Sequence, residues 1–355
     1  MYMHTREATK IMINVAIVGY GDAGRRYHSY LISLVEGLNL HAVATRDADR
    51  RRAATTKYGV KVYTTIDDLL KDDGIGLVVV ATPHDTHAEF SIKAMEAGKH
   101  VVTDKAMCMN VSECDAMIEA SKQNNVMLSV FHNRRLDWDF STVKKVLAER
   151  MIGTPYYFET GVMQYAGPIG WRTEKARVGG ILYDWGAHFI DQMLQLVSDK
   201  VEKVFCEIQY RGWGKDVGSY AKLLTRFSNG VLYQIEIGNL AAGPRPRWYI
   251  LGEEGTFVKF GMDPQEEAMF NGNIDAAKED PEHRSRIFTD GSDCGSERTI
   301  DSVRSSWKEY YQNISDVLNK GAQLAVTPEE IRRVMLVIEA ATLSAETGQA
   351  VNADI

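Results

Sequence analysis

The chain has 355 residues, 45% of them hydrophobic and 25% charged, with a formal net charge of −7 at pH 7. This length has room for two domains with cores of their own, and the acidic balance excludes the basic footprint of a protein that binds nucleic acid or anionic membrane. No apolar run approaches the roughly 20 residues that span a bilayer.

The N-terminus and the cysteines indicate in which cellular compartment the protein is expected. Residues 1–10 are polar and lack the apolar core of a secretion signal, so we expect a tail that precedes the fold. Cys108, Cys114, Cys206 and Cys294 form neither a C-x-x-C pair nor a zinc spacing. Scattered cysteines in a chain of this size favour reduced thiols and a cytoplasmic protein.

Strands and helices alternate through residues 11–134, which predicts an α/β domain with a doubly wound parallel sheet. Asn110 or Ser112 is expected to cap the last of its helices. The expected strands are 15–18, 40–44, 60–62, 77–81, 101–103 and 127–131, and the expected helices are 48–58, 86–97 and 111–124, with a turn over 66–70.

From residue 135 to 355 the order of elements changes, because several candidate strands follow one another without helices between them. This pattern predicts a C-terminal α+β domain with a large, mostly antiparallel, open-faced sheet, whose free face pairs with a second copy in a homodimer or homotetramer. Asn229-Gly230 predicts a two-residue hairpin, and the polar segment 261–298 predicts a loop. The expected strands are 155–164, 201–211, 220–227, 231–237, 248–252 and 256–260, and the expected helices are 138–150, 181–197, 302–318 and 328–346.

A glycine-rich turn follows the first expected strand. Gly19, Gly21 and Gly24 fit G-x-G-x-x-G, in which the glycines permit a tight turn, backbone approach to a pyrophosphate and close packing of helix on strand. The following helix presents amides and its dipole to phosphates. The residues expected to bind the dinucleotide here are Gly19, Tyr20, Gly21, Asp22, Ala23 and Gly24.

The end of the second expected strand bears on the choice of cofactor. An NAD site commonly has an acid there for the ribose 2′-hydroxyl, whereas this chain has Thr45-Arg46. A hydroxyl and a guanidinium favour a 2′-phosphate and therefore NADP(H). Asp47, one residue further on, keeps NAD(H) open.

Asp184 and His188 lie four residues apart on an expected helix, after Gly179-Gly180, and so share one face. Imidazole, with an ordinary pKa of about 6.5, is the natural proton carrier. We therefore expect His188 to act as acid and base and Asp184 to bind and orient substrate. The structural alternative is an i,i+4 polar pair or a histidine satisfied within the core.

Four motifs follow one another along the chain: the Gly19–Gly24 turn, Ala81-Thr-Pro-His-Asp-Thr-His87, Ala97-Gly-Lys-His-Val-Val-Thr-Asp-Lys105 and Gly179-Gly-Ile-Leu-Tyr-Asp-Trp-Gly-Ala-His-Phe-Ile-Asp191. In this order they resemble the motifs of the Gfo/Idh/MocA oxidoreductases, named for glucose–fructose oxidoreductase and inositol dehydrogenase. The resemblance implies an NAD(P)-binding Rossmann domain over residues 11–134, a substrate-binding and oligomerisation domain over 135–355, and a sugar or cyclic polyol as substrate.

Lys105 lies just past a strand end, where open α/β sheets bind ligands. Position and resemblance together predict that its ammonium holds the reacting oxygen, although most lysines are solvated surface groups. The family usually has Glu-Lys-Pro where this chain has Asp104-Lys105-Ala106, and usually Asn at the position of His84. The sequence leaves open the backbone geometry at Lys105.

Other candidates surround these motifs. His84, Asp85 and His87 invite a metal interpretation, but they lack a matching third site, so we expect no metal. Aromatic rings and amide or guanidinium groups suit sugar binding. The residues expected beside the nicotinamide are Thr82, Pro83, His84, His87, Asp104 and Lys105, and those expected to bind substrate are Lys105, Asn133, Tyr165, Trp171, Arg172, Asp184 and His188.

These features predict an NAD(P)-dependent dehydrogenase or reductase acting on a carbohydrate-like alcohol or ketone. One alternative is a redox-neutral enzyme that cleaves glycosides through a transient ketone and keeps its NAD bound. Another is a non-catalytic NAD(P)-binding regulator, which the presence of both Lys105 and His188 disfavours.

Overall fold

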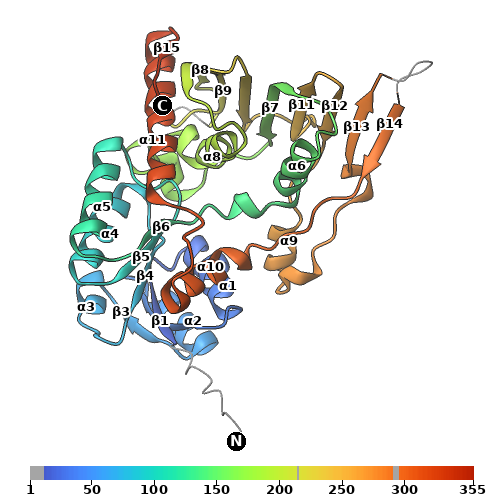
Figure 1. The fold of residues 1–355 in the computed structure, drawn as a ribbon. Coiled ribbons are helices and arrows are strands. Elements are labelled where there is room, and N and C mark those ends of the chain that lie inside the picture. The colour runs from blue at the N-terminus through green and yellow to red at the C-terminus, as the bar shows by residue number, and fades with distance from the viewer. Residues whose placement is uncertain (1–11, 214–215, 291–295) are drawn as a thin grey trace, which may run out of the picture.

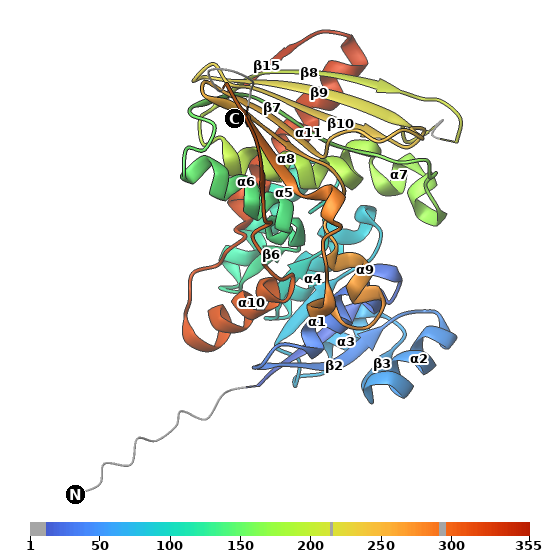
Figure 2. The same cartoon turned by 90° about the vertical axis from the view of Figure 1, so that its right-hand side faces the viewer.

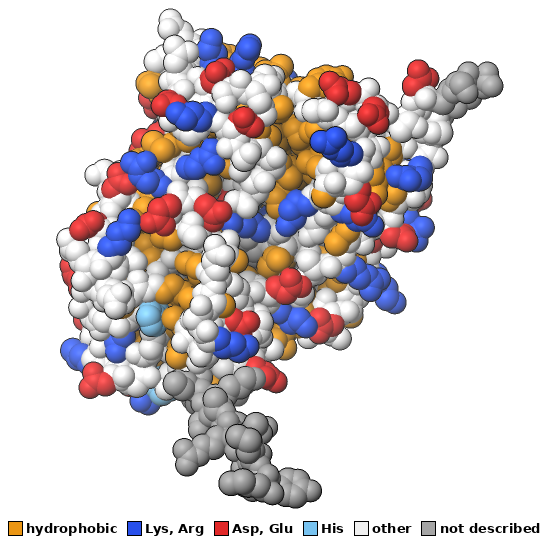
Figure 3. Space-filling view, viewed as in Figure 1, with side chains coloured by type: hydrophobic (Ala, Val, Ile, Leu, Met, Phe, Trp, Pro, Cys, Tyr) orange, Lys and Arg blue, Asp and Glu red, His pale blue; other side chains and the backbone are white. Residues whose placement is uncertain are grey.

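The computed structural model describes residues 12–213, 216–290 and 296–355, so the expected tail over 1–10 and Cys294 lie outside the described residues. The described chain forms two sheets with helices around and between them (Figures 1 and 2). None of its described helices is long and apolar enough to cross a membrane. Acidic and basic side chains are interspersed over the face seen in Figure 3, without a field of one sign.

The first sheet has six strands in the order β3-β2-β1-β4-β5-β6, and every neighbouring pair is parallel. Its central strands are apolar on both faces because helices cover both, which confirms the predicted doubly wound sheet. The order reverses between β1 and β4, the point at which such sheets bind ligands. The strands are β1 (Ile13–Val18), β2 (Leu38–Ala44), β3 (Lys61–Tyr63), β4 (Leu77–Val80), β5 (His100–Thr103) and β6 (Leu128–Val130).

Side-chain caps begin three of the helices around this sheet. The carboxylate of Asp47 accepts from the amides of Asp49 and Arg50, Thr65 caps the next helix, and Asn110 rather than Ser112 caps the last. The first glycine turn is followed by a π-helical turn over Ala23–His28. The helices are α1 (Ser29–Ser33), α2 (Ala48–Tyr58), α3 (Ile66–Leu70), α4 (His87–Glu96) and α5 (Val111–Gln123).

The second sheet has nine strands in the order β14-β13-β12-β11-β7-β10-β9-β8-β15. All neighbouring pairs are antiparallel except β7 with β10, which agrees with the predicted mostly antiparallel sheet. The strands are β7 (Pro155–Met163), β8 (Val201–Gln209), β9 (Tyr220–Phe227), β10 (Leu232–Gly238), β11 (Trp248–Gly252), β12 (Gly255–Lys259), β13 (Ser285–Thr289), β14 (Ser296–Ile300) and β15 (Val351–Asn352).

Helices α6 and α8 lie between the second sheet and the first domain, as Figure 2 shows. Near the end of the chain, α10 returns to the first domain, where Ser315 donates to the backbone carbonyl of Glu36 at 2.7 Å. The boundary expected at residues 134/135 stays a prediction. The helices of this part are α6 (Trp138–Ala148), α7 (Lys175–Val178), α8 (Ala187–Leu196), α9 (Gln265–Phe270), α10 (Lys308–Lys320) and α11 (Pro328–Thr347).

The predicted helix over 181–197 is confirmed as one continuous helical segment, in which the turn Leu182–Gly186 is π-helical and α8 follows it. Two other local expectations were wrong. The polar segment 261–298 is not one loop, because it forms α9 and supplies β13 and the start of β14. The turn at Asn229-Gly230 has three residues, since the amide of Phe227 bonds to the carbonyl of Val231 and only Gly230 has a positive φ, 87°.

Candidate active site

A cleft of about 620 Å³ runs along the carboxyl ends of β1, β2 and β4. A Cβ at Gly19 would collide with the carbonyl oxygen of Ala81, and one at Gly24 with that of Gly19, so both positions require glycine. Gly21 faces open space, with its nearest side-chain atom, Nη1 of Arg50, 3.7 Å from a built Cβ. The backbone of this turn is therefore exposed to the cleft, and the arrangement fits a dinucleotide pyrophosphate.

The far end of this cleft carries Thr45 and Arg46. Arg46 is exposed and forms no ion pair with the described residues. Asp47, by contrast, caps α2 through one carboxylate oxygen and lies 3.3 Å from Nε of Arg50 through the other. Asp47 also does not line the cleft, so its carboxylate is directed to the helix rather than to a ribose.

A second cavity, of about 230 Å³, adjoins the cleft. Lys105 enters it from the segment after β5, and Asp184 from the π-helical turn before α8. The ammonium of Lys105 donates to Oδ1 of Asp184 at 2.6 Å and to its backbone carbonyl at 2.9 Å. Five residues line both spaces, which joins the cavity to the cleft: Asp22, Ala23, Asp104, Lys105 and Arg172.

The charges around Asp184 fix its protonation state. Burial alone would raise the pKa of its carboxyl group, but Lys105 and Arg172 lower the pKa below its usual value. Nε of Arg172 lies 3.7 Å from Oδ2 of Asp184. Asp184 is therefore a carboxylate with a cation on each oxygen.

His188 lines the same cavity with 6% of its surface exposed. Its Nδ1 is buried and has no hydrogen-bond partner among the described residues. The ring meets His132 edge to face, with 5.8 Å between centroids. Burial holds the pKa of His188 well below 6.5, and the positive charges of Lys105 and Arg134 lower it further. The imidazole is therefore neutral near pH 7 and able to accept a proton.

Of the residues after β4 that were expected beside the nicotinamide, some line the cleft and one does not. Thr82, Pro83 and His84 line it, as does Trp171, whose ring meets that of His84 edge to face at 4.9 Å. Nδ1 of His84 lies 2.9 Å from the carbonyl oxygen of Val178. Burial first, then His87 and Lys105, lowers the pKa of His84 to about 3, so this ring is neutral as well.

Two expected site residues lie elsewhere. His87 is fully buried, and its ring nitrogens lie 2.8 Å from the carbonyls of Ala106 and Thr82, so it holds the backbone beneath the cleft instead of lining it. Tyr165 is 65% exposed and packs on Trp213 outside the cavity. Asn133 does line the cavity. No group of three or more metal-ligating side chains occurs in the described part of the chain.

Comparison with known proteins identifies the family. The model of an oxidoreductase family with an NAD-binding Rossmann fold matches residues 13–132, and that of the GFO/IDH/MocA C-terminal domain matches residues 140–258. The chain belongs to the Gfo/Idh/MocA oxidoreductase family. This Gfo/Idh/MocA protein is therefore an NAD(P)-binding oxidoreductase, and the resemblance seen in its motifs is confirmed.

Relatives match over most of this Gfo/Idh/MocA chain. The scyllo-inositol 2-dehydrogenase (NADP(+)) IolW of Bacillus subtilis is 31% identical over 343 residues, which cover 94% of each chain. The myo-inositol 2-dehydrogenase of Thermotoga maritima is 29% identical over 251 residues, 68% of this chain and 74% of its own. The crystal structure of an NAD-binding protein from Listeria innocua has a TM-score of 0.85 at 32% identity, covering 96% of this chain and 97% of that one.

The departures from the Gfo/Idh/MocA motif are now placed. The peptide bond between Lys105 and Ala106 is cis. The carboxylate of Asp104 accepts from the amide of Lys105 at 2.8 Å. Burial would raise the pKa of Asp104, but His28 and Lys105 lower it, so the shorter acid is ionised beneath the lysine. His84 stands where the family usually has Asn, and it lines the cleft at the carboxyl ends of β1, β2 and β4.

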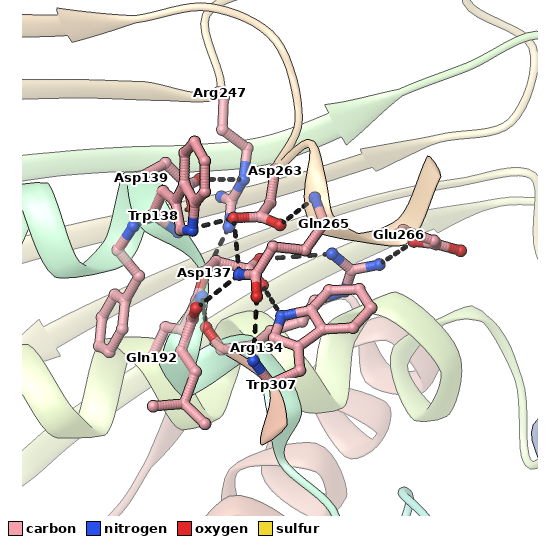
Figure 4. Close-up of polar contacts among 12 residues, drawn as sticks. Arg134, Asp137, Trp138, Asp139, Gln192, Arg247, Asp263, Gln265, Glu266 and Trp307 are labelled. Carbon is pink, nitrogen blue, oxygen red and sulfur yellow. Dashed lines mark hydrogen bonds and ion pairs between the residues drawn. The ribbon is translucent and has the colours of Figure 1, made fainter. Parts of the chain in front are cut away.

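One wall of the second cavity could not be expected from the sequence motifs. Glu266, on α9, reaches the cavity from the segment expected to be a loop. Its carboxylate accepts from the hydroxyl of Tyr27. It also accepts, at 2.8 Å, from Nη2 of Arg134, as Figure 4 shows. Trp185 completes this wall beneath the guanidinium of Arg134, 4.6 Å from the ring centroid.

Proposed function

We propose that this protein transfers hydride between NADP(H) and a neutral carbohydrate-like alcohol or ketone, such as a cyclic polyol or a sugar. The observation that carries the proposal is the grouping of Lys105, Asp184 and a neutral His188 in one cavity that opens into the dinucleotide cleft. A cavity of about 230 Å³ suits a molecule of monosaccharide size.

In the oxidation direction, the bound nicotinamide supplies the acceptor for the hydride that leaves the carbinol carbon. Lys105 hydrogen-bonds the substrate oxygen and stabilises the negative charge that develops on it. His188 accepts the proton of the O–H bond, and the C–O bond becomes a carbonyl. Asp184 holds Lys105 through the 2.6 Å contact and orients a neighbouring hydroxyl. Reduction reverses each step, with a protonated His188 as the acid.

NADP(H) is favoured over NAD(H) by the end of the cleft near β2. Arg46 is exposed there without an ion pair among the described residues, so its guanidinium is available for a 2′-phosphate. Asp47 is occupied by capping α2. A similar protein, IolW, is named as NADP(+)-dependent.

Three described cysteines, all free and buried, support the proposal of a cytoplasmic enzyme.

The test is a panel of inositols, hexoses and pentoses with NAD and NADP separately, read by absorbance of the reduced nicotinamide. We expect oxidation of at least one neutral polyol, with higher kcat/KM for NADP. A protein purified with cofactor bound, and indifferent to added NAD(P), would instead favour the redox-neutral alternative. No transfer with any polyol in either direction would refute the proposal.

A further inference from the structure

Glu266 faces the substrate cavity with hydrogen-bonding capacity to spare. One carboxylate oxygen accepts from Tyr27 and the other from Arg134. An ionised carboxylate accepts about four hydrogen bonds, so about two lone pairs stay free. The side chain is 33% exposed and lines two spaces, the cavity that holds Lys105 and His188 and a separate pocket beside α9.

Arg134, beside it, has little left to offer an anion. Its guanidinium donates to Asp137 at 3.3 Å and to Glu266 at 2.8 Å (Figure 4). It also lies over the rings of Trp185 and Trp307. The whole residue is 6% exposed. Burial raises the pKa of Asp137 well above its ordinary value, so the acid that balances the charge of Arg134 is Glu266, across the shorter contact. The carboxylate of Glu266 is the group that this wall presents to a ligand.

The other charged side chains that line the cavity also leave no free positive charge for an anionic ligand. The ionisable side chains of the lining, apart from neutral His188 and the Tyr27 phenol, are four acids against three bases. Asp22 is paired with Arg25 at 3.3 Å, so the lining has neither an excess acid nor an excess base. A substrate with its own carboxylate or phosphate would find no unpaired cation among the described residues there and would meet Glu266 as a like charge, which is unfavourable. The acids are Asp22, Asp104, Asp184 and Glu266, and the bases are Lys105, Arg134 and Arg172.

We infer that Glu266 is a specificity-determining residue: it accepts a hydrogen bond from a hydroxyl on a carbon other than the reacting one and rejects substrates that carry an anionic group there. The inference rests on the proposed function and narrows it to neutral polyhydroxylated substrates. Arg134 and Tyr27 are positioning residues, since they hold the carboxylate from two sides.

The test compares Glu266→Gln with Glu267→Gln, a matched control on the same helix whose side chain is exposed and lies outside the cavity. The probes are myo-inositol and D-glucose, which are neutral, and D-glucuronate, which differs from glucose by a carboxylate at C6. Calorimetry on NADP-loaded protein gives dissociation constants for all three, and hydride transfer gives kcat/KM for those that turn over.

Glu266→Gln is expected to weaken binding of the neutral probes by about 10-fold or more, since a hydrogen bond to a charged group is lost. It is also expected to strengthen glucuronate binding, because Arg134 loses a neutralising partner. Glu267→Gln should leave all three constants within twofold. Glu266→Asp, which keeps the charge but withdraws it by one methylene, should weaken the neutral probes and still reject glucuronate.

The inference is overturned if folded Glu266→Gln, with unchanged affinity for NADP, keeps the wild-type ratio of neutral to anionic affinity. A merely structural role for Glu266 predicts that outcome, with a lower thermal midpoint. Wild-type protein that binds neither neutral probe overturns it as well. Binding of neutral probes without hydride transfer in either direction would instead refute the proposed function and leave the role of Glu266 in binding to be read from the same constants.

Discussion

Truncation of His188 to alanine is expected to lower single-turnover hydride transfer by about 10²- to 10⁴-fold, the scale of one acid–base contribution. At about 1.4 kcal/mol for each factor of ten, this is roughly 3–5 kcal/mol of barrier. Because the pKa of His188 lies well below 6.5, the acid limb of the wild-type oxidation profile should lie below pH 6.5.

The effect on stability should be small by comparison. Loss of a buried ring costs roughly 2–4 kcal/mol of packing. However, Nδ1 of His188 is buried without a partner among the described residues, and removing such an atom returns about 1–3 kcal/mol. The net change of roughly 1–2 kcal/mol corresponds to a thermal midpoint a few degrees lower.

The assay follows absorbance of the reduced nicotinamide in a single turnover, with the thermal midpoint and the NADP affinity measured on the same protein. His41→Ala is the control, because His41 pairs with Asp72 away from the cavity and should keep wild-type turnover. Folded His188→Ala with hydride transfer within about threefold of the wild type would refute the proton role and leave Lys105 as the leading candidate.

Three further predictions follow from other parts of the molecule. Arg46→Asp should weaken NADP(H) about 10- to 150-fold in fluorescence titrations and NAD(H) much less, and equal losses would contradict the 2′-phosphate assignment. Burial, partly offset by Asp191, lowers the pKa of His132 to about 4, so the unfolded chain takes up a proton here between pH 6.5 and 4 that the folded protein does not, and stability falls as the pH falls. In urea unfolding, His132→Gln should lower the slope of the unfolding free energy against pH by about 1.4 kcal/mol per pH unit in this range. An unchanged slope would contradict the assignment of this pH dependence to His132. Phe205 and Leu232 are each 38% exposed on the sheet, and light scattering should show a dimer or tetramer that Leu232→Asp weakens; a stable wild-type monomer at micromolar concentration would rule out that interface.

The first sheet could be predicted because the residues within and next to its strands carry the pattern that marks them. β4 (Leu77–Val80) is buried throughout, as a central parallel strand requires, and the glycines after β1 have roles that adjacent residues define. The same holds for Asp184 and His188, whose spacing alone places them on one face. Local pattern and final structure agree wherever nearby residues decide the geometry.

The missed features either lack a local sequence pattern or depend on side-chain contacts that no pattern marks. β14 is exposed or half-buried along its whole length, so no apolar alternation marks it as a strand, and α9 has only six residues. Glu266 reaches Tyr27 across 239 positions of sequence and Arg134 across 132. His87 follows a strand end as a ligand-binding residue would, but the direction of its ring is set by the carbonyls of Thr82 and Ala106.

The position of Lys105 explains why His188 gives the sharper test of mechanism. Lys105 comes from the first domain and bonds both the carboxylate and the backbone carbonyl of Asp184, which comes from the second. Its removal would abolish the stabilising charge, leave Asp184 with only the longer Arg172 contact and loosen a connection between the two domains. A loss of turnover in Lys105→Ala therefore combines chemistry with placement. His188 makes no such connection through Nδ1, so its truncation isolates the proton transfer.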